Sequence, residues 1–228
     1  GWDWGPALVT CGIWKDISLV SFSTGRITNI LVNQKHHRFG KSSSIVVGRL
    51  CESARRDSVP AYNKTRVDLN ATIDTPGKTP LTAKFTLSLN GKKVSSASCR
   101  VNSGSAKVSM TVNNPSLWWP NGMGKQPLYD LSVSLLNADG MLIDTLTKRV
   151  GLRTLVLERK KDKWGECFRF AVNGVPFFSK GANWIPAHTF ATSITRDDYR
   201  RLITDAKSAN MNMLRLWGGG IFEYDAFY

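Results

Sequence analysis

The chain has 228 residues and a formal net charge of +14, with 42% hydrophobic and 21% charged residues. This length allows one to three domains, and the composition is that of a globular protein rather than a disordered one. No apolar run approaches the roughly 18 residues of a membrane-spanning helix, so we expect no membrane segment here.

The excess of positive charge has two interpretations, a nucleic-acid-binding surface or a solvated basic surface. The basic residues scatter through positions 35–66, 84–107 and 148–163, and aromatic residues do not alternate with them. Nucleic-acid sites combine a basic groove with aromatic stacking platforms. We therefore expect no nucleic-acid partner.

The sequence opens on Gly1-Trp2-Asp3-Trp4 and closes on Phe227-Tyr228. The opening has neither a basic segment nor an apolar core, so we expect no signal peptide in this stretch. An aromatic-rich opening and an apolar end are typical of a piece cut from a longer protein. We expect this chain to be such a piece.

From Gly12 to about Val156 the pattern predicts β-structure almost throughout. Apolar and polar residues alternate in five segments: Ile17–Phe22, Thr65–Ile73, Thr82–Leu89, Ala106–Val112 and Tyr129–Leu135. Asn90-Gly91 predicts a hairpin, because both residues accept the positive φ angles of a type I′ turn. Regular strands with such turns predict a β-sandwich. The polar, basic stretch Lys35–Pro60 predicts a loop, and we place a domain boundary near Ile27.

The pattern changes after Val172. Pro176–Lys180 predicts a short strand, and Thr195 with Asp198 fits a capping box that opens a helix. Tyr199, Leu202, Ile203 and Ala206 continue at helical spacing, Asn210 can end the helix, and Asn212–Leu216 predicts a second strand. A strand, a helix and a strand within about 40 residues predict a βαβ unit with parallel strands.

The cysteines Cys11, Cys51, Cys99 and Cys167 lie too far apart for a CxxC metal or redox site, and their pairing cannot be deduced. We expect no metal site. Asn63-Lys-Thr65 and Asn70-Ala-Thr72 are sequons, so Asn63 and Asn70 are possible glycosylation sites. They favour a secreted or lysosomal protein.

Several aromatic- and glycine-rich motifs run along the chain. They are Gly1-Trp-Asp-Trp-Gly-Pro6 followed by Gly12-Ile-Trp-Lys15, Leu117-Trp-Trp-Pro-Asn-Gly122 with Gln126-Pro-Leu-Tyr129, Gly151-Leu-Arg-Thr154, Val172-Asn-Gly174 with Phe177-Phe-Ser-Lys-Gly-Ala-Asn-Trp-Ile-Pro186, and Asn210-Met-Asn-Met-Leu-Arg-Leu-Trp-Gly-Gly-Gly220. These motifs resemble those of the β-mannosidases of glycoside hydrolase family 2. They span nearly the whole chain in the order that the family has.

The resemblance implies a multidomain fold of β and α/β parts. Residues 1–26 would be the C-terminal end of a sugar-binding β-sandwich, and residues 27–156 an immunoglobulin-like β-sandwich. Residues 157–228 would begin a TIM-barrel catalytic domain, a (β/α)8 barrel, with its first βαβ unit. Two strands cannot close a barrel of eight, so we expect the barrel to be truncated here.

The resemblance also implies a sugar site. Trp2 and Asp3 lie in a shaped loop, where Asp3 would bind a hydroxyl of the terminal mannose; the alternative is an ordinary turn aspartate. Trp217 follows the second strand at its carboxyl end, where barrel active sites lie. It would form a wall of the sugar pocket, and the alternative is a packing role.

Arg215 would support a nucleophilic carboxylate by hydrogen bonding, and an ordinary salt bridge is the alternative. Asn183, Trp184 and Glu223 would lie behind the residues that touch the sugar. Retaining glycosidases need two carboxyl groups about 5–5.5 Å apart. Glu223 and Asp225 are too close in sequence to flank one glycosidic bond, so we assign no catalytic residue in this chain.

The leading hypothesis is that the parent protein is a retaining exo-β-mannosidase that removes terminal β-D-mannose without a cofactor. Its partner would be a β-mannoside oligosaccharide or a glycoprotein-derived glycan. The isolated chain would then be inactive. The alternative is a non-catalytic, carbohydrate-binding β-sandwich module.

Overall fold

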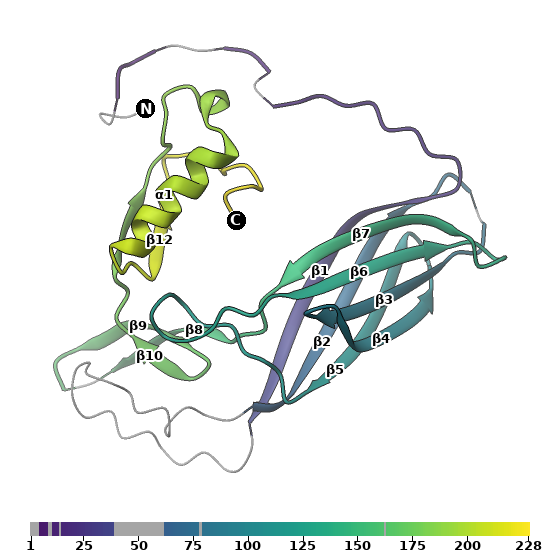
Figure 1. Ribbon diagram of the computed structural model, residues 1–228, viewed down its shortest axis with the longest axis horizontal. Coiled ribbons are helices and arrows are strands. Elements are labelled where there is room, and N and C mark those ends of the chain that lie inside the picture. The colour runs from purple at the N-terminus through teal and green to yellow at the C-terminus, as the bar shows by residue number, and fades with distance from the viewer. Residues whose placement is uncertain (1–4, 9–10, 14, 39–61, 78, 162) are drawn as a thin grey trace. The chain divides into compact units, whose positions relative to one another are not determined.

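The computed structural model describes residues 5–8, 11–13, 15–38, 62–77, 79–161 and 163–228 (Figure 1). The described residues form two compact units. One lies within positions 21–119 and 124–177, and the other within positions 1–20, 120–123 and 178–228.

The first unit is built mainly from two antiparallel sheets. One sheet has the order β1-β2-β5, with β1 at Arg26–Arg38, β2 at Tyr62–Asp74 and β5 at Ser105–Asn113. The other has the order β4-β3-β6-β7, with β3 at Thr82–Leu89, β4 at Lys92–Arg100, β6 at Tyr129–Leu136 and β7 at Leu142–Val150.

The two sheets share one apolar core. In β2 every second residue from Val67 to Ile73 is buried, and in β3 Ala83, Phe85 and Leu87 are buried in the same way. Such alternation places one face of each strand inside and the other face outside. The predicted β-sandwich is confirmed, as are four of the five predicted strands, which became β2, β3, β5 and β6.

The predicted hairpin is also confirmed. Asn90 and Gly91 connect β3 to β4 with φ angles of 51° and 76°. Two consecutive residues with positive φ define a type I′ turn, whose twist matches that of the flanking strands.

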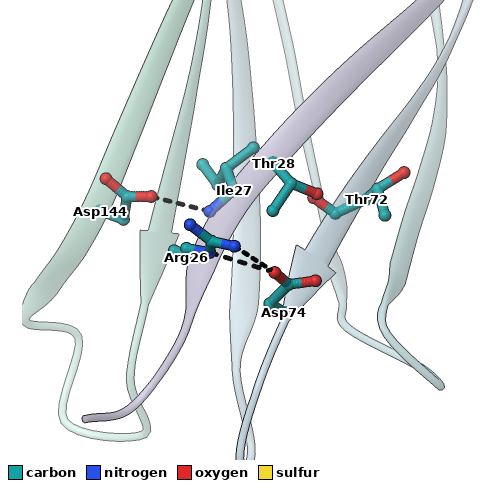
Figure 2. Close-up of polar contacts among 6 residues, drawn as sticks. All are labelled: Arg26, Ile27, Thr28, Thr72, Asp74 and Asp144. Carbon is teal, nitrogen blue, oxygen red and sulfur yellow. Dashed lines mark hydrogen bonds and ion pairs between the residues drawn. The ribbon is translucent and has the colours of Figure 1, made fainter. Parts of the chain in front are cut away.

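Among the strands that the sequence did not reveal is β1, which lies at the edge of its sheet and is tied to the opposite sheet. Figure 2 shows its first residues: Arg26 donates two hydrogen bonds to Asp74 of β2, and the Ile27 N–H donates to the Asp144 carboxylate of β7 at 2.7 Å. Further along, the Lys148 ammonium of β7 donates to the Ile30 carbonyl at 3.0 Å. These bonds between edge strands β1 and β7 close one side of the sandwich.

Two predictions about the N-terminal half are corrected. Ile17–Phe22 forms no strand, because a strand exists through pairing and this segment pairs with no other described residue; Leu19 is 99% exposed. The loop predicted from Lys35 to Pro60 begins no earlier than residue 39, because Lys35–Arg38 pair with β2. The rest of that stretch, residues 39–60, lies outside the described residues.

A buried tyrosine fixes the connection between β5 and β6. Tyr129, the first residue of β6, is 1% exposed, and its hydroxyl accepts a hydrogen bond from the Ser116 N–H at 2.8 Å. Sandwich domains of the immunoglobulin type carry a comparable tyrosine corner near the start of the sixth strand.

A small antiparallel sheet with the order β10-β9-β8 completes the first unit. Its strands are β8 at Leu155–Lys161, β9 at Glu166–Val172 and β10 at Val175–Phe177. Asn173 and Gly174, with φ angles of 49° and 78°, turn β9 into β10. The predicted strand Pro176–Lys180 is therefore wrong in position, since Pro176 and Phe177 pair backwards with β9 and residues 178–180 belong to no strand.

The βαβ unit is confirmed in the second compact unit. It consists of β11 at Gly181–Trp184, a short 3-10 helix η2 at Ala191–Ser193, α1 at Arg196–Ser208 and β12 at Met213–Leu216. β11 and β12 pair in parallel, and Thr195 and Asp198 form both bonds of the capping box. Asn210, with a φ angle of 58°, follows the helix, as predicted for its end.

No helix among the described residues is long and apolar enough to cross a membrane. Cys11, Cys99 and Cys167 are free thiols, and Cys51 lies outside the described residues.

Removing the Tyr129 hydroxyl tests how much this tyrosine corner contributes to stability. We expect Tyr129→Phe to lower the free energy of unfolding by about 1–3 kcal/mol, because the Ser116 N–H loses its partner in a partly buried position. Denaturant unfolding measures the change. Tyr228→Phe is the matched control, since Tyr228 is 70% exposed. Equal stabilities of the two variants would contradict the assignment.

The capping box makes a second prediction. Thr195→Ala removes the hydroxyl that accepts from the Asp198 N–H, and we expect a loss of about 1 kcal/mol in stability. Thr204→Ala, in the exposed middle of the same helix, is expected to be neutral or slightly stabilising because alanine is the better helix former. Thermal unfolding of both variants separates these outcomes, and a Thr195→Ala protein as stable as Thr204→Ala would refute the prediction.

Candidate functional site

The candidate site lies at the carboxyl ends of β11 and β12. Because the two strands are parallel, the residues that follow them begin at the same edge of the sheet, where α/β proteins bind their ligands. Trp184 is the last residue of β11 and pairs with Leu216. The N–H of the next residue, Trp217, donates to the Trp184 carbonyl at 2.9 Å.

Trp217 is half-buried and begins a tight glycine turn. The Gly220 N–H donates to the Trp217 carbonyl at 3.1 Å, and the Trp217 ring lies against Gly219, where an added Cβ would overlap the indole. Glycine at position 219 is therefore required by the close approach of the ring.

Glu223 is a buried carboxylate in the loop after β12, with only 7% exposure. Its Oε1 accepts a hydrogen bond from the Trp184 indole N–H at 2.8 Å, and its Oε2 accepts one from the Tyr199 hydroxyl at 2.5 Å. Burial and the bond to Glu223 raise the pKa of Tyr199 well above its ordinary value, so this hydroxyl keeps its proton.

An aromatic cluster encloses this carboxylate. The Phe227 ring lies 4.7 Å from the Trp184 ring and 5.6 Å from the Tyr199 ring, between ring centroids. Trp184 and Tyr199 lie 6.4 Å apart. The separations are those of favourable aromatic pairs, so the cluster both excludes water and holds the two donors in place.

Arg215 and Asn183 form a second polar contact on the same strand pair. They are register partners, and the Arg215 Nη1 donates to the Asn183 Oδ1 at 3.1 Å. Both side chains are exposed. Asn212 has a different role: its side chain bonds the Lys180 N–H and the Phe178 carbonyl and so fixes the chain that enters β11.

An open pocket of about 540 Å³ lies between the end of β11 and α1. Asn183 and Trp184 contribute to its wall, together with the charged side chains of Asp198 and Arg201. The other lining residues are Ile185, Ala187, His188, Ser193, Ile194 and Leu202. Five of these ten lining residues are polar or charged.

The structure thus brings together Asn183 with Arg215, and Trp184 with Trp217 and Glu223. Trp2 and Asp3 lie outside the described residues. Asn63 and Asn70 are half-buried in β2, where the Asn70 Oδ1 accepts a bond from the Ser105 hydroxyl.

Sequence reasoning missed Tyr199 and Phe227 as parts of this cluster. Tyr199 was expected only as one residue of the apolar stripe of α1, and its hydroxyl partner lies 24 residues away. A buried tyrosine needs a hydrogen-bond partner, which was the available signal, but the sequence does not say which residue provides it.

The geometry limits the chemistry of the carboxylates. Both oxygens of Glu223 accept hydrogen bonds within a buried cluster, whereas Asp225 is exposed. Among the described residues, no group of three or more His, Cys, Asp or Glu side chains could hold a metal ion.

Comparisons with known proteins agree with this fold. Residues 58–153 match the family described as Glycosyl hydrolases family 2. The chain is 36% identical to Beta-mannosidase B of Aspergillus niger over 228 residues and 38% identical to Beta-mannosidase B of Emericella nidulans over 229 residues. Both matches include 100% of this chain but 24% of the relative, so the chain spans about a quarter of these proteins' length.

Solved structures give the same result. A β-D-mannosidase of Dictyoglomus thermophilum superposes with a TM-score of 0.82 at 35% identity, over 100% of this chain and 25% of that one. A β-glucuronidase of Bifidobacterium dentium superposes with a TM-score of 0.66 at 15% identity, over 90% of this chain and 29% of that one; this likeness is of fold alone. Residues 58–153 are thus similar to glycosyl hydrolases family 2, and proteins named β-mannosidase are similar to this chain along its whole length.

Proposed function

We propose that the protein to which this chain belongs is a retaining exo-β-mannosidase that hydrolyses terminal, non-reducing β-D-mannose residues. The observation that carries the proposal is the full-length similarity of the chain to proteins named β-mannosidase, at 35–38% identity. The presence of Trp217, Asn183 and Arg215 at or near the carboxyl ends of β11 and β12 supports it, since sugar sites use aromatic faces beside groups that bind hydroxyls.

In this proposal the chain binds and orients the sugar, while two carboxyl groups elsewhere in the protein perform the chemistry. A retaining mechanism needs one carboxyl as acid and base and one as nucleophile, about 5–5.5 Å apart. Glu223 is engaged with Trp184 and Tyr199 and is assigned a supporting role instead. Arg215, which donates a hydrogen bond to Asn183, would support the nucleophile.

We further propose the domain assignment that the motifs suggest. Residues 1–26 end a sugar-binding sandwich, residues 27–156 form an immunoglobulin-like sandwich, and residues 157–228 begin a TIM barrel. The tyrosine corner at Tyr129 supports the second of these. The parallel pair β11 and β12, with α1 between them, supports the third, because a barrel is built from repeated units of this kind.

The substrate would be a β-mannoside oligosaccharide or a glycoprotein-derived glycan, and hydrolysis of this type needs no cofactor. The sequons at Asn63 and Asn70 support a secreted or lysosomal location.

The activity is tested with the full-length protein. We expect it to hydrolyse an aryl β-D-mannoside and to act much less on the matching β-glucoside, β-galactoside and β-glucuronide. NMR of the first product should show β-mannose, as double displacement requires. Binding of mannosides without turnover would favour the alternative, a carbohydrate-binding module, and an α-anomer as first product would exclude retention.

Asp3 provides a sharper test of the sugar site. We expect Asp3→Ala in the full-length protein to lower kcat/KM by about 1–3 kcal/mol of transition-state stabilisation, because a sugar hydroxyl loses its acceptor. Asp130→Ala is the control, since Asp130 lies exposed on β6. If Asp3→Ala melts normally and retains the kcat/KM of the control, Asp3 is not part of the site.

A further inference from the structure

Trp184 anchors both ends of the loop that contains Trp217. At the start of the loop, the Trp217 N–H donates to the Trp184 carbonyl at 2.9 Å. At its end, the Glu223 carboxylate accepts from the Trp184 indole N–H at 2.8 Å. One residue at the end of β11 thus closes the loop Trp217–Glu223 into a ring.

A third element fixes the same carboxylate. Tyr199 comes from the first turns of α1 and donates to the second oxygen of Glu223, while Phe227 packs on both donors. Hydrogen bonds to a charged acceptor in a buried cluster are stronger than those in water. A Trp184 or Tyr199 donor left buried without its acceptor would cost folding stability. Trp184, Tyr199 and Glu223 therefore keep one another in position.

The loop needs such anchors because its sequence is flexible. Gly218, Gly219 and Gly220 are consecutive, and glycine has more backbone freedom than any other residue. The Trp217 ring rests on Gly219, and Gly220 bonds back to the Trp217 carbonyl. The place of the indole therefore depends on the path of the loop that Glu223 closes.

We infer that Glu223 is a positioning residue that holds the Trp217 indole in the sugar site through its bonds to Trp184 and Tyr199. This inference rests on the proposed function, in which Trp217 forms a wall of the mannose pocket. Glu223 itself does not touch the sugar, and its effect on catalysis passes through Trp217.

A double-mutant cycle in the full-length enzyme separates positioning from plain stability. We expect Glu223→Ala to lower kcat/KM on an aryl β-mannoside by about tenfold, chiefly through KM, because the indole no longer holds one position. The kcat/KM of Glu223→Gln should lie between those of Glu223→Ala and the wild type, because glutamine keeps one acceptor oxygen. In a Trp217→Ala background, Glu223→Ala should change kcat/KM by less than about twofold.

Thermal melts of all variants provide the structural readout. Glu223→Ala should lower Tm by a similar amount in both backgrounds, since the bonds to Trp184 and Tyr199 do not involve the Trp217 side chain. If Glu223→Ala does not fold, Tyr199→Phe takes its place in the cycle, because it removes one bond to Glu223 and keeps the ring that packs on Phe227.

The outcomes distinguish this inference from the proposed function. Equal losses of kcat/KM in both backgrounds, or no loss from Glu223→Ala, overturn the positioning role and leave the sugar wall intact. If Trp217→Ala alone retains the wild-type kcat/KM, Trp217 is not a wall of the pocket and the proposed site fails together with the inference.

Discussion

The parallel pairing of β11 with β12 is the constraint on which the candidate site depends. A parallel pair needs a long crossover connection, and α1 supplies it. The crossover brings the chain back so that β12 runs in the same direction as β11. Both strands therefore end at one edge of the sheet, and Trp217, which follows β12, lies beside Trp184, the last residue of β11. An antiparallel pair would have sent these two residues to opposite ends of the sheet.

A buried charge then organises that edge. Glu223 can be buried only because both of its oxygens are hydrogen-bonded, since an unpaired carboxylate would be expelled or neutralised. Its partners come from the end of β11 and from α1, so the carboxylate joins the strand and the helix to the loop after β12. The polar group gives the loop a definite path that apolar packing alone specifies less sharply.

Features that depend on neighbouring residues could be predicted from the sequence. The Asn90-Gly91 turn needs two positive φ angles, and the capping box needs Thr195 and Asp198 three residues apart; both were recognised from these requirements. Asn173-Gly174 carries the same turn signal, and recognising it would have placed β10 correctly.

Features that depend on distant partners could not be predicted in this way. The alternation in Ile17–Phe22 indicates a strand as clearly as that in Thr82–Leu89, yet only the second has paired neighbours among the described residues. β1 shows the reverse case, because its place is set by Asp74 and Asp144, which are 48 and 117 residues away from their partners.

The candidate site shows how these two kinds of information combine. Local sequence identifies Trp217 and its three glycines as a flexible turn after a strand, which alone would leave a bulky indole without a fixed position. The fold supplies what the local sequence lacks, because Trp184 and Tyr199 reach Glu223 across 39 and 24 residues. The three glycines allow the Trp217 ring to lie close against the backbone, but they also make the loop flexible. The buried Glu223 carboxylate counteracts this flexibility by fixing the path of the loop. A binding wall of the kind proposed for Trp217 would need both, since close approach and a fixed position make opposite demands on the same seven residues.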